Sequence, residues 1–241
     1  MNIISVKTRK VIPPKDEIYD ILDEISTNLS EKDIILITSK IVAIHEGRCV
    51  KKYDVDKDKL IKKEAYKFIP REEVPGGHAI LTIKENALLA SSGIDESNSG
   101  EYFTLLPKNP IKSAKFIWEY LRNKADILDL GVIITDSHTQ PLRYGTVGIS
   151  VGSFGLEIFR DYRHTKDIFG REIKISRVNI VDSLASIGVL SMGEGSEQTP
   201  ISIIRGLDDI VFSDNENYPK LKIPLEEDIY YPILKEFNKS K

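Results

Sequence analysis

The chain has 241 residues, of which 41% are hydrophobic and 29% charged, and its formal net charge is −3. This composition is that of a globular protein with a real core, and the charge excludes a global basic field for nucleic acid or an anionic membrane. A single cysteine excludes an intrachain disulfide, and no apolar stretch resembles a signal peptide or a membrane span of ~20 residues, so we expect a cytoplasmic protein.

The first part of the chain alternates apolar runs with amphipathic segments. The pattern predicts, in order, a strand over 2–6, an amphipathic helix over 16–29, a buried strand over 33–38 and a helix over 40–46. Ser39 can cap this last helix and Gly47 can end it. A helix that begins directly after a strand offers free N–H groups to a phosphate, although a plain strand–helix unit is the simpler interpretation.

Residues 51–63 are rich in charge and predict a solvated loop with a short helix. Residues 78–83 and 87–91 then predict a hairpin. The segment SSGIDESN, residues 91–98, places Asp95 and Asn98 directly after that hairpin. Pro110 suits the first turn of an amphipathic helix running to about Arg122.

The most informative stretch is 130–155. Leu130 to Ile134 predicts a buried strand, which we expect to end in the polar turn 135–138. Polar side chains at the carboxyl end of a buried strand are typical of a ligand site in an α/β sheet. Four glycines follow, at 145, 148, 152 and 155, and such density lets backbone amides approach an anion. A glycine-relaxed hairpin is the equally favoured alternative.

The last part of the chain returns to short elements and loops. The pattern predicts a strand over 156–159, a loop over 161–171, a strand over 173–181, a helix over 182–190 capped by Asp182, a glycine-acid loop over 192–200 and a strand over 201–205. An acidic tail begins at about residue 208 and contains one candidate helix near 229–237. Neither a GxxxxGK[ST] run nor a GxGxxG turn occurs, so neither common nucleotide motif applies.

Three acidic loops, at 95–98, 136–137 and 193–198, follow predicted strands or helices. If they converge, their carboxylates and a hydroxyl would form an oxygen cage suited to Mg²⁺ or Mn²⁺ shared with nucleotide phosphates. Taken singly, each loop is better explained as a capped turn with a solvated acid.

Six stretches of the sequence occur in the order found in one enzyme family: TSKIVAIHEGR (38–48), SSGIDESN (91–98), LLPKNPIKSA (105–114), GVIITDSHTQPLRYGTVGISVG (131–152), KDIFGREIKISRVNIVDSLAS (166–186) and MGEGSEQTPISIIRGL (192–207). Together they resemble the coenzyme F-420-0:L-glutamate ligase family. The resemblance implies a mixed α/β (α+β) fold, neither P-loop nor ATP-grasp, in one unit over 1–241 with lobes at 1–129 and 130–241. It also implies an intertwined homodimer.

The family resemblance further implies a reaction. Enzymes of this family join the amine of L-glutamate to a terminal carboxylate of a phosphorylated deazaflavin, through an acyl phosphate, with GTP and divalent metal. ATP in place of GTP and an additional K⁺ ion are further candidates. Carried over by position, the implied metal ligands are Asp95, Asp136, Ser137 and Glu194. The implied nucleotide contacts are Ser39, Lys40, Asn98, Met192, Gly193, Glu194, Gly195 and Gln198.

Asp95 and Asp136 are also the implied catalytic acids, and Arg143 could grip a phosphate or the incoming carboxylate bidentately. An ordinary surface ion pair explains Arg143 equally well. Three positions depart from the family pattern: Ile44 replaces a lysine, Gln140 an arginine and Ser183 a glutamate. Loss of two cations leaves two alternatives open, a folate-type acceptor bearing a glutamyl carboxylate and a non-catalytic relative that binds a nucleotide or cofactor.

Overall fold

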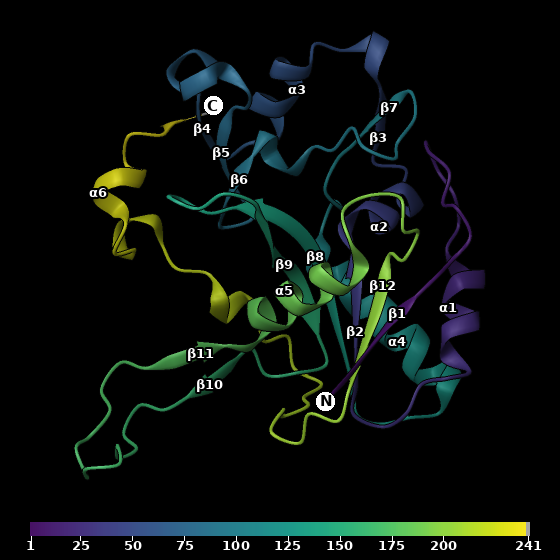
Figure 1. Ribbon diagram of the computed structural model, residues 1–241, viewed down its shortest axis with the longest axis vertical. Coiled ribbons are helices and arrows are strands. Elements are labelled where there is room, and N and C mark those ends of the chain that lie inside the picture. The colour runs from purple at the N-terminus through teal and green to yellow at the C-terminus, as the bar shows by residue number, and fades with distance from the viewer. Residues whose placement is uncertain (240–241) are drawn as a thin grey trace.

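A five-stranded mixed sheet forms the centre of the computed structural model, which describes residues 1–239 (Figure 1). β2 and β8 pair in parallel and the other neighbours are antiparallel. In spatial order the strands are β1 (Asn2–Val6), β12 (Ile201–Arg205), β2 (Asp33–Thr38), β8 (Leu130–Thr139) and β9 (Thr146–Phe154). The central sheet therefore takes strands from both the beginning and the end of the chain.

Helices cover both faces of this sheet because its strands alternate apolar residues between the two faces. Ile35 and Ile37 of β2 pack in the cluster that includes α1 (Tyr19–Ser26) and α4 (Pro110–Ala125). Their neighbours Ile34 and Leu36 pack in a second cluster with α5 (Ile180–Met192). The result is a helix–sheet–helix sandwich, with α5 crossing the front of the sheet in Figure 1.

A smaller lobe lies at one end of the sandwich and has its own apolar cluster, which includes Ile61, Ile80 and Phe103. It contains a four-stranded sheet in the order β13-β4-β5-β6 and a two-stranded β3–β7 ladder. Its elements are β3 (Cys49–Lys51), α3 (Lys57–Glu64), β4 (Lys67–Ile69), β5 (Leu81–Lys84), β6 (Ala87–Ala90), β7 (Tyr102–Thr104) and β13 (Asn238–Lys239). α2 (Ser39–His45) lies between this lobe and the central sheet.

Two segments leave the sandwich. β10 (Phe159–Asp161) and β11 (Arg177–Asn179) form the base of a ribbon that projects far from the body, which we call the β10–β11 arm (Figure 1). The C-terminal segment runs up the same side of the molecule through α6 (Tyr231–Leu234) and returns to the small lobe, where β13 pairs with β4. Within residues 1–239, the helices lack the combination of length and apolar character needed to cross a bilayer.

The mixed α/β class is confirmed, and strands 33–38 and 201–205 have the expected bounds. Two predicted strands were wrong: residues 156–159 form only an isolated bridge at Leu156 before β10 begins, and within 173–181 only Arg177–Asn179 is a strand. Three other local expectations were also wrong. The polar turn predicted at 135–138 is the continuation of β8, which passes a bulge at Ile134/Thr135 and keeps pairing with β9 to Thr139. Helix α5 is capped by Asn179, whose side chain accepts from the Asp182 N–H. Ser39 is the first residue of α2 and Thr38 precedes it.

The glycines of β9 explain close packing and not anion binding. A Cβ on Gly148 would lie 2.2 Å from the Ala185 carbonyl oxygen of α5, and one on Gly152 would lie 2.5 Å from the Pro110 carbonyl carbon of α4. Glycine therefore allows a helix to pack tightly on each face of the same edge strand. The lobe boundary at residues 129 and 130 stays a prediction, although β2 and β8 on either side of it pair within one sheet.

Candidate active site

A cavity of about 640 Å³ opens at one edge of the central sheet, where it meets the small lobe. β2 and β8 are parallel, so their carboxyl ends reach the same edge, and the 192–200 loop arrives there because β12 runs the opposite way. The 93–104 segment of the small lobe lines the other side. This is the edge at which open α/β sheets bind ligands.

The structure brings together eleven of the twelve residues singled out from the sequence. Those that line the cavity are Ser39, Lys40, Asp95, Asn98, Asp136, Ser137, Met192, Gly193, Glu194, Gly195 and Gln198. The three acidic loops, which are separated by 38 and 56 positions in the chain, thus converge on one space. The twelfth residue, Arg143, does not line it.

Asp95 and Lys40 form the best-defined charged pair in the cavity. The Lys40 Nζ lies 2.6 Å from Asp95 Oδ2 and also donates to the Ser97 carbonyl and hydroxyl at 2.8 and 3.0 Å. Ser97 in turn donates its N–H and Oγ–H to Asp95 Oδ1. Burial opposes ionisation of Asp95, but the Lys40 ammonium outweighs it and lowers the pKa of the carboxyl below its ordinary value.

Asp136 lies on the cavity floor in the opposite electrostatic situation. The pKa of Asp136 is raised from 3.8 to about 7, chiefly by desolvation. The nearby charges of Asp95 and Glu194 contribute to this rise, whereas a backbone hydrogen bond with Ser137 and the charge of Lys40 oppose it. A carboxyl pushed toward neutrality by burial and like charges is the typical signature of a functional site, because a bound cation would reverse both effects.

The 192–200 loop closes the polar end of the cavity. Glu194 Oε2 lies 3.5 Å from the Ser137 hydroxyl, which donates to it. The Asn98 side chain donates to the Gly195 carbonyl at 2.9 Å, so the small lobe is joined to this loop across the cavity. Carboxylates and a hydroxyl from three separate segments therefore face one another here.

The cavity carries more acid than base. Its charged lining residues are Asp95, Glu101, Asp136, Glu194 and Glu197 on the acidic side and Arg9, Lys10 and Lys40 on the basic side. These oxygen donors have the hard chemistry that Mg²⁺ and Mn²⁺ prefer. As placed, no three His, Cys, Asp or Glu side chains within residues 1–239 are close enough to hold a metal.

One wall of the cavity was missed by the sequence analysis. Residues 8–13, which we call the N-terminal arm, line it with Val11, Ile12 and Pro13, and Ile41 and Ile44 of α2 add to this apolar surface. The arm follows β1 without regular secondary structure, so no periodic pattern marks it. The Pro13-Pro14 pair was the only signal, and it indicates a break in structure and not a binding surface.

The three departures from the family pattern occupy different places. Ile44 is buried in the cavity wall, 1% exposed. Gln140 lies at the exposed tip of the β8–β9 hairpin with Arg143. Ser183 lies on the outer side of α5, where its hydroxyl donates to the Asn179 carbonyl. Only Ile44 changes the character of the cavity itself.

Comparison with known proteins gives a consistent result. The sequence model of the F420-0:Gamma-glutamyl ligase family matches residues 6–206. Similar proteins include the Coenzyme F420:L-glutamate ligases of Methanopyrus kandleri, 32% identical over 86% of this chain and 87% of the relative, and of Methanocaldococcus jannaschii, 34% identical over 84% and 86%. That of Haloarcula marismortui is 28% identical over 99% of this chain and 98% of the relative.

The family match includes every cavity segment described above, from the N-terminal arm to the 192–200 loop. The C-terminal segment beyond residue 206 lies outside it. The chain therefore belongs to the F420-0:gamma-glutamyl ligase family and is an enzyme of the γ-glutamyl ligase class.

Proposed function

We propose that this enzyme joins L-glutamate to a terminal carboxylate of a phosphorylated deazaflavin, at the expense of GTP and with Mg²⁺ or Mn²⁺. The observation that carries the proposal is the convergence of Asp95, Asp136 and Glu194 on one cavity. Relatives named for this activity match most of the chain and support the choice of substrates. Because the chain has a single cysteine and so no intrachain disulfide, we place the enzyme in the cytoplasm.

The surplus of acid supports a requirement for metal. A nucleotide triphosphate would be repelled by these carboxylates unless cations lay between them and the phosphates. Asp95, Asp136, Ser137 and Glu194 would hold the metal, which supplies charge neutralisation at the phosphoryl group being transferred. Their side chains would have to draw together from the positions described above. A K⁺ ion is a further candidate, and ATP is the alternative to GTP.

The proposed reaction has two steps, phosphoryl transfer to the acceptor and then amide formation. A carboxylate oxygen of the acceptor attacks the γ-phosphorus of GTP, the bond to the β–γ bridging oxygen breaks, and GDP leaves. The glutamate amine, having lost a proton, then attacks the acyl carbon, and phosphate leaves as the amide bond forms. Ser39 and the 192–198 loop would position the nucleotide with their N–H groups, and Lys40, released from Asp95, would contact a phosphate.

The apolar side chain of Ile44 bears on the identity of the acceptor. An apolar residue on the cavity wall offers no charge to a phosphate, so an acceptor with fewer phosphates would fit as well. A folate bearing a glutamyl carboxylate is the second candidate.

The proposal is tested by measuring phosphate release with GTP or ATP, L-glutamate and Mn²⁺, in separate reactions with a deazaflavin acceptor and a panel of folates. We expect release that requires glutamate, metal and the deazaflavin together. Release with a folate but not the deazaflavin would replace the acceptor. No release with any acceptor, from protein with the folded far-UV spectrum, would overturn the proposal.

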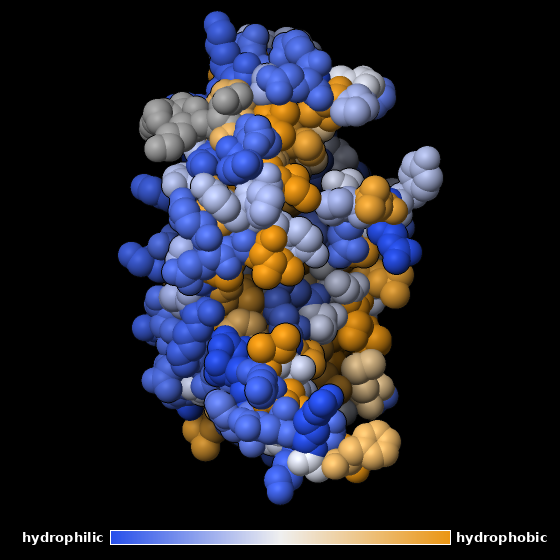
Figure 2. Space-filling view, turned by 90° about the vertical axis from the view of Figure 1, so that its left-hand side faces the viewer, coloured by the Kyte–Doolittle hydropathy of each residue, from blue (hydrophilic) through white to orange (hydrophobic). Residues whose placement is uncertain are grey.

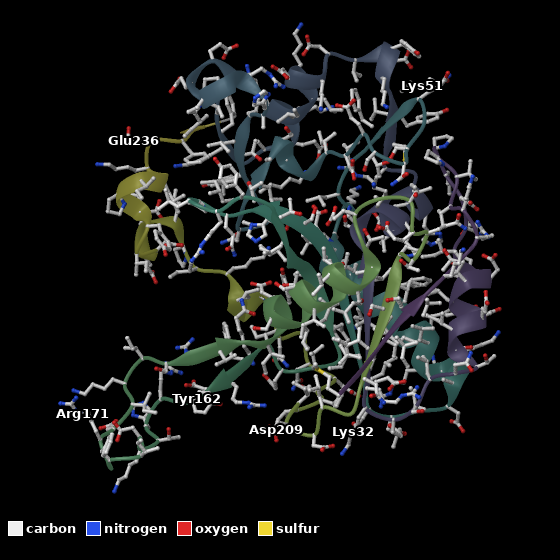
Figure 3. All side chains as sticks on the ribbon, viewed as in Figure 1. Lys32, Lys51, Tyr162, Arg171, Asp209 and Glu236 are labelled. Atoms are coloured by element: carbon white, nitrogen blue, oxygen red, sulfur yellow. The ribbon has the colours of Figure 1, made fainter. Side chains whose placement is uncertain are left out.

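We also propose that two copies of the chain form a homodimer. Figure 2 shows apolar side chains gathered along the middle of the face that carries α6 and the β10–β11 arm. The exposed apolar residues of these segments include Ile168, Phe169, Ile229 and Ile233, each at least 66% exposed. Tyr162 and Arg171 lie out on the arm in Figure 3, well away from the body of the protein. Exposed apolar surface on this scale is typical of an interface.

The position of Arg143 fits the same assembly. It lies between Leu142 and Tyr144, both fully exposed, at the tip of the β8–β9 hairpin. β8 ends at Thr139 and Arg143 lies in the exposed turn that follows it, outside the residues that line the cavity of its own copy. In a dimer, Arg143 would grip the phosphate or carboxylate of a substrate bound to the partner. Sedimentation of a stable monomer at micromolar concentration would contradict the dimer.

A further inference from the structure

The turn that leads from β6 to Asp95 has an unusual backbone. Ser91, Ser92 and Gly93 have φ values of +53°, +58° and +67°, three consecutive residues in the left-handed region. Only glycine adopts this region without steric cost, because a Cβ there lies too close to the following carbonyl oxygen. Two of the three residues nevertheless carry a side chain. Such a run persists only where the surrounding structure holds it, and it points to a role for the turn.

Ser92 fixes this turn to the interior of the small lobe. It is 0% exposed, and its hydroxyl donates to the Ile61 carbonyl of α3 at 3.0 Å. Its N–H donates to the Thr82 hydroxyl of β5 at 2.9 Å, and that hydroxyl donates onward to the Leu89 carbonyl of β6. Because the turn is bonded to a helix and two strands, its position follows the core of the small lobe.

The other side of the turn lies against the central sheet. β6, which leads into the turn, packs beside β8, which carries Asp136 (Figure 1). A Cβ on Gly93 would lie 3.1 Å from Asp136 Oδ2 and 2.9 Å from Leu106 Cγ, so glycine allows the turn to approach this carboxylate closely. The backbone of the turn therefore forms a wall beside the Asp136 carboxylate.

The same turn sets where the chain enters the cavity. Asp95 follows Gly93 by two residues, and its N–H and its carbonyl both pair with Thr104, at 2.9 Å each. The Asp95 carboxylate comes from the small lobe and that of Asp136 from the central sheet, and both line the cavity. The spacing of the two carboxylates thus depends on how the turn sits against the sheet.

We propose that Ser92 is a positioning residue, which sets the spacing of the Asp95 and Asp136 carboxylates through the 91–93 turn. Loss of its hydroxyl frees the turn from α3, so the wall beside Asp136 and the entry of Asp95 shift together. The inference rests on the proposed function for the divalent ion that the two carboxylates share. It does not rest on it for the bond between the turn and α3, which can be tested in metal-free protein.

The test uses two variants of Ser92 and one matched control. Ser92→Ala removes the hydroxyl and keeps the Cβ, whereas Ser92→Gly also suits the positive φ and so relieves the steric cost that alanine retains. Ser91→Gly is the control, because Ser91 has nearly the same φ but its hydroxyl makes no hydrogen bond within residues 1–239.

In metal-free protein, we expect hydrogen exchange at the amides of residues 92–97 to become faster in both Ser92 variants and to stay close to the parent rate in Ser91→Gly. Isothermal titration with Mn²⁺ should give a Kd about tenfold higher in both Ser92 variants, the lower end of the cost of losing a residue that supports a metal ligand. Ser91→Gly should keep the parent Kd. In turnover assays, the Mn²⁺ concentration that gives half-maximal activity should rise by the same factor, with a smaller change in kcat at saturating Mn²⁺.

A merely structural role would lower the Tm of the Ser92 variants and leave their Kd for Mn²⁺ at the parent value, and that result would overturn the proposal. Unchanged exchange at residues 92–97 would overturn it as well. A parent protein that binds no Mn²⁺ would contradict the metal requirement of the proposed function and this proposal with it. Faster exchange with parent-like Mn²⁺ affinity would contradict this proposal alone.

Discussion

The two ends of the β8–β9 hairpin differ sharply although one continuous motif encodes both. At what we call the base of the hairpin, where β8 parts from β2, Asp136 lies half-buried on the cavity floor and desolvation raises the pKa of its carboxyl to about 7. At the tip, Arg143 has no side-chain partner within residues 1–239 and lies between two fully exposed residues. The cause is the sheet: β2 pairs with β8 only as far as Thr135. Beyond that point β9 is the only strand within residues 1–239 that pairs with β8, and the hairpin runs past β6 of the small lobe to an exposed tip.

Residues that are close in the sequence need not share a site. Asp136 and Arg143 were both expected to be catalytic, yet only the first lies in the cavity of its own chain. β8 ends at Thr139, and Arg143 lies in the exposed turn beyond it. The predictions that follow test whether the base and the tip act in one reaction, and whether they do so within one copy or between two.

Asp136→Asn should have the largest effect, because it removes the charge at the base while keeping its shape. We expect kcat to fall by more than about 100-fold, the upper range for residues that only support a metal ligand. Isothermal titration with Mn²⁺ should show binding in the parent and none in the variant. Asp182→Asn, which alters a hydrogen-bonded carboxylate outside the cavity, is a control for general damage. Parent-like metal binding by Asp136→Asn would make Asp136 a structural residue.

Arg143→Ala tests the tip. Loss of a charge-assisted hydrogen bond worth ~1.5–3 kcal/mol should lower kcat/KM roughly 10- to 150-fold. Tm should not change, since the exposed Arg143 side chain has no hydrogen-bond or ion-pair partner within residues 1–239. Lys63→Ala, at the exposed end of α3 in the small lobe, removes a comparable surface charge away from the cavity and from the proposed interface, and serves as the control.

Mixing the two inactive variants separates action within a copy from action between copies. If Arg143 serves the partner, a re-equilibrated equal mixture of Asp136→Asn and Arg143→Ala should recover about a quarter of the parent activity, because half of the dimers are mixed and each has one intact site. Action within one copy gives no intact site and no recovery.

The sequence predicted the base of the hairpin better than its surroundings. Asp95, Asp136 and Glu194 could be named because carboxylates after buried strands are unusual and the family pattern places them. Their convergence could not be derived from spacing, since it depends on β12 lying antiparallel between β1 and β2. The sequence did not indicate the N-terminal arm because an extended, unpaired segment has no periodic hydrophobic pattern. Its position also involves hydrogen bonds to a residue far along the chain, those between Thr8 and Gln198.

The glycines of β9 show that glycine density alone does not predict a binding site. Their density suggested an anion site, yet Gly148 and Gly152 are small because α5 and α4 pack against them. Sequence alone cannot distinguish a glycine that admits a ligand from one that admits a helix, since both need the same missing Cβ. Only knowledge of which elements cover each face of the strand separates the two.

Changing the pH should alter metal binding at the base and leave the tip unaffected. Below pH 7 the Asp136 carboxyl holds a proton that a metal must displace, so Mn²⁺ affinity should fall by up to about tenfold per pH unit below 7. In metal-free protein the folded state has the raised pKa, so stability is greatest at low pH for this group and is lost as pH rises through about 7. Asp136→Asn should show neither dependence, measured by titration and by thermal unfolding from pH 5.5 to 8.

Ile44→Lys has the smallest expected effect and bears on which substrate faces the apolar wall. Ile44 is 1% exposed, so a lysine there must pay for burying its stem while its ammonium reaches into the cavity. One new charge-assisted contact to a phosphate, worth ~1.5–3 kcal/mol, less this cost, should lower the KM of the deazaflavin acceptor roughly threefold and that of GTP less. Ile44→Met, of similar length but neutral, controls for shape.

Adding Gln140→Arg should extend the gain only if the hairpin tip reaches a substrate, since Gln140 lies outside its own cavity. Unchanged acceptor kinetics with a lower KM for GTP would place Ile44 against the nucleotide, and the argument for an acceptor poorer in phosphate would then fail.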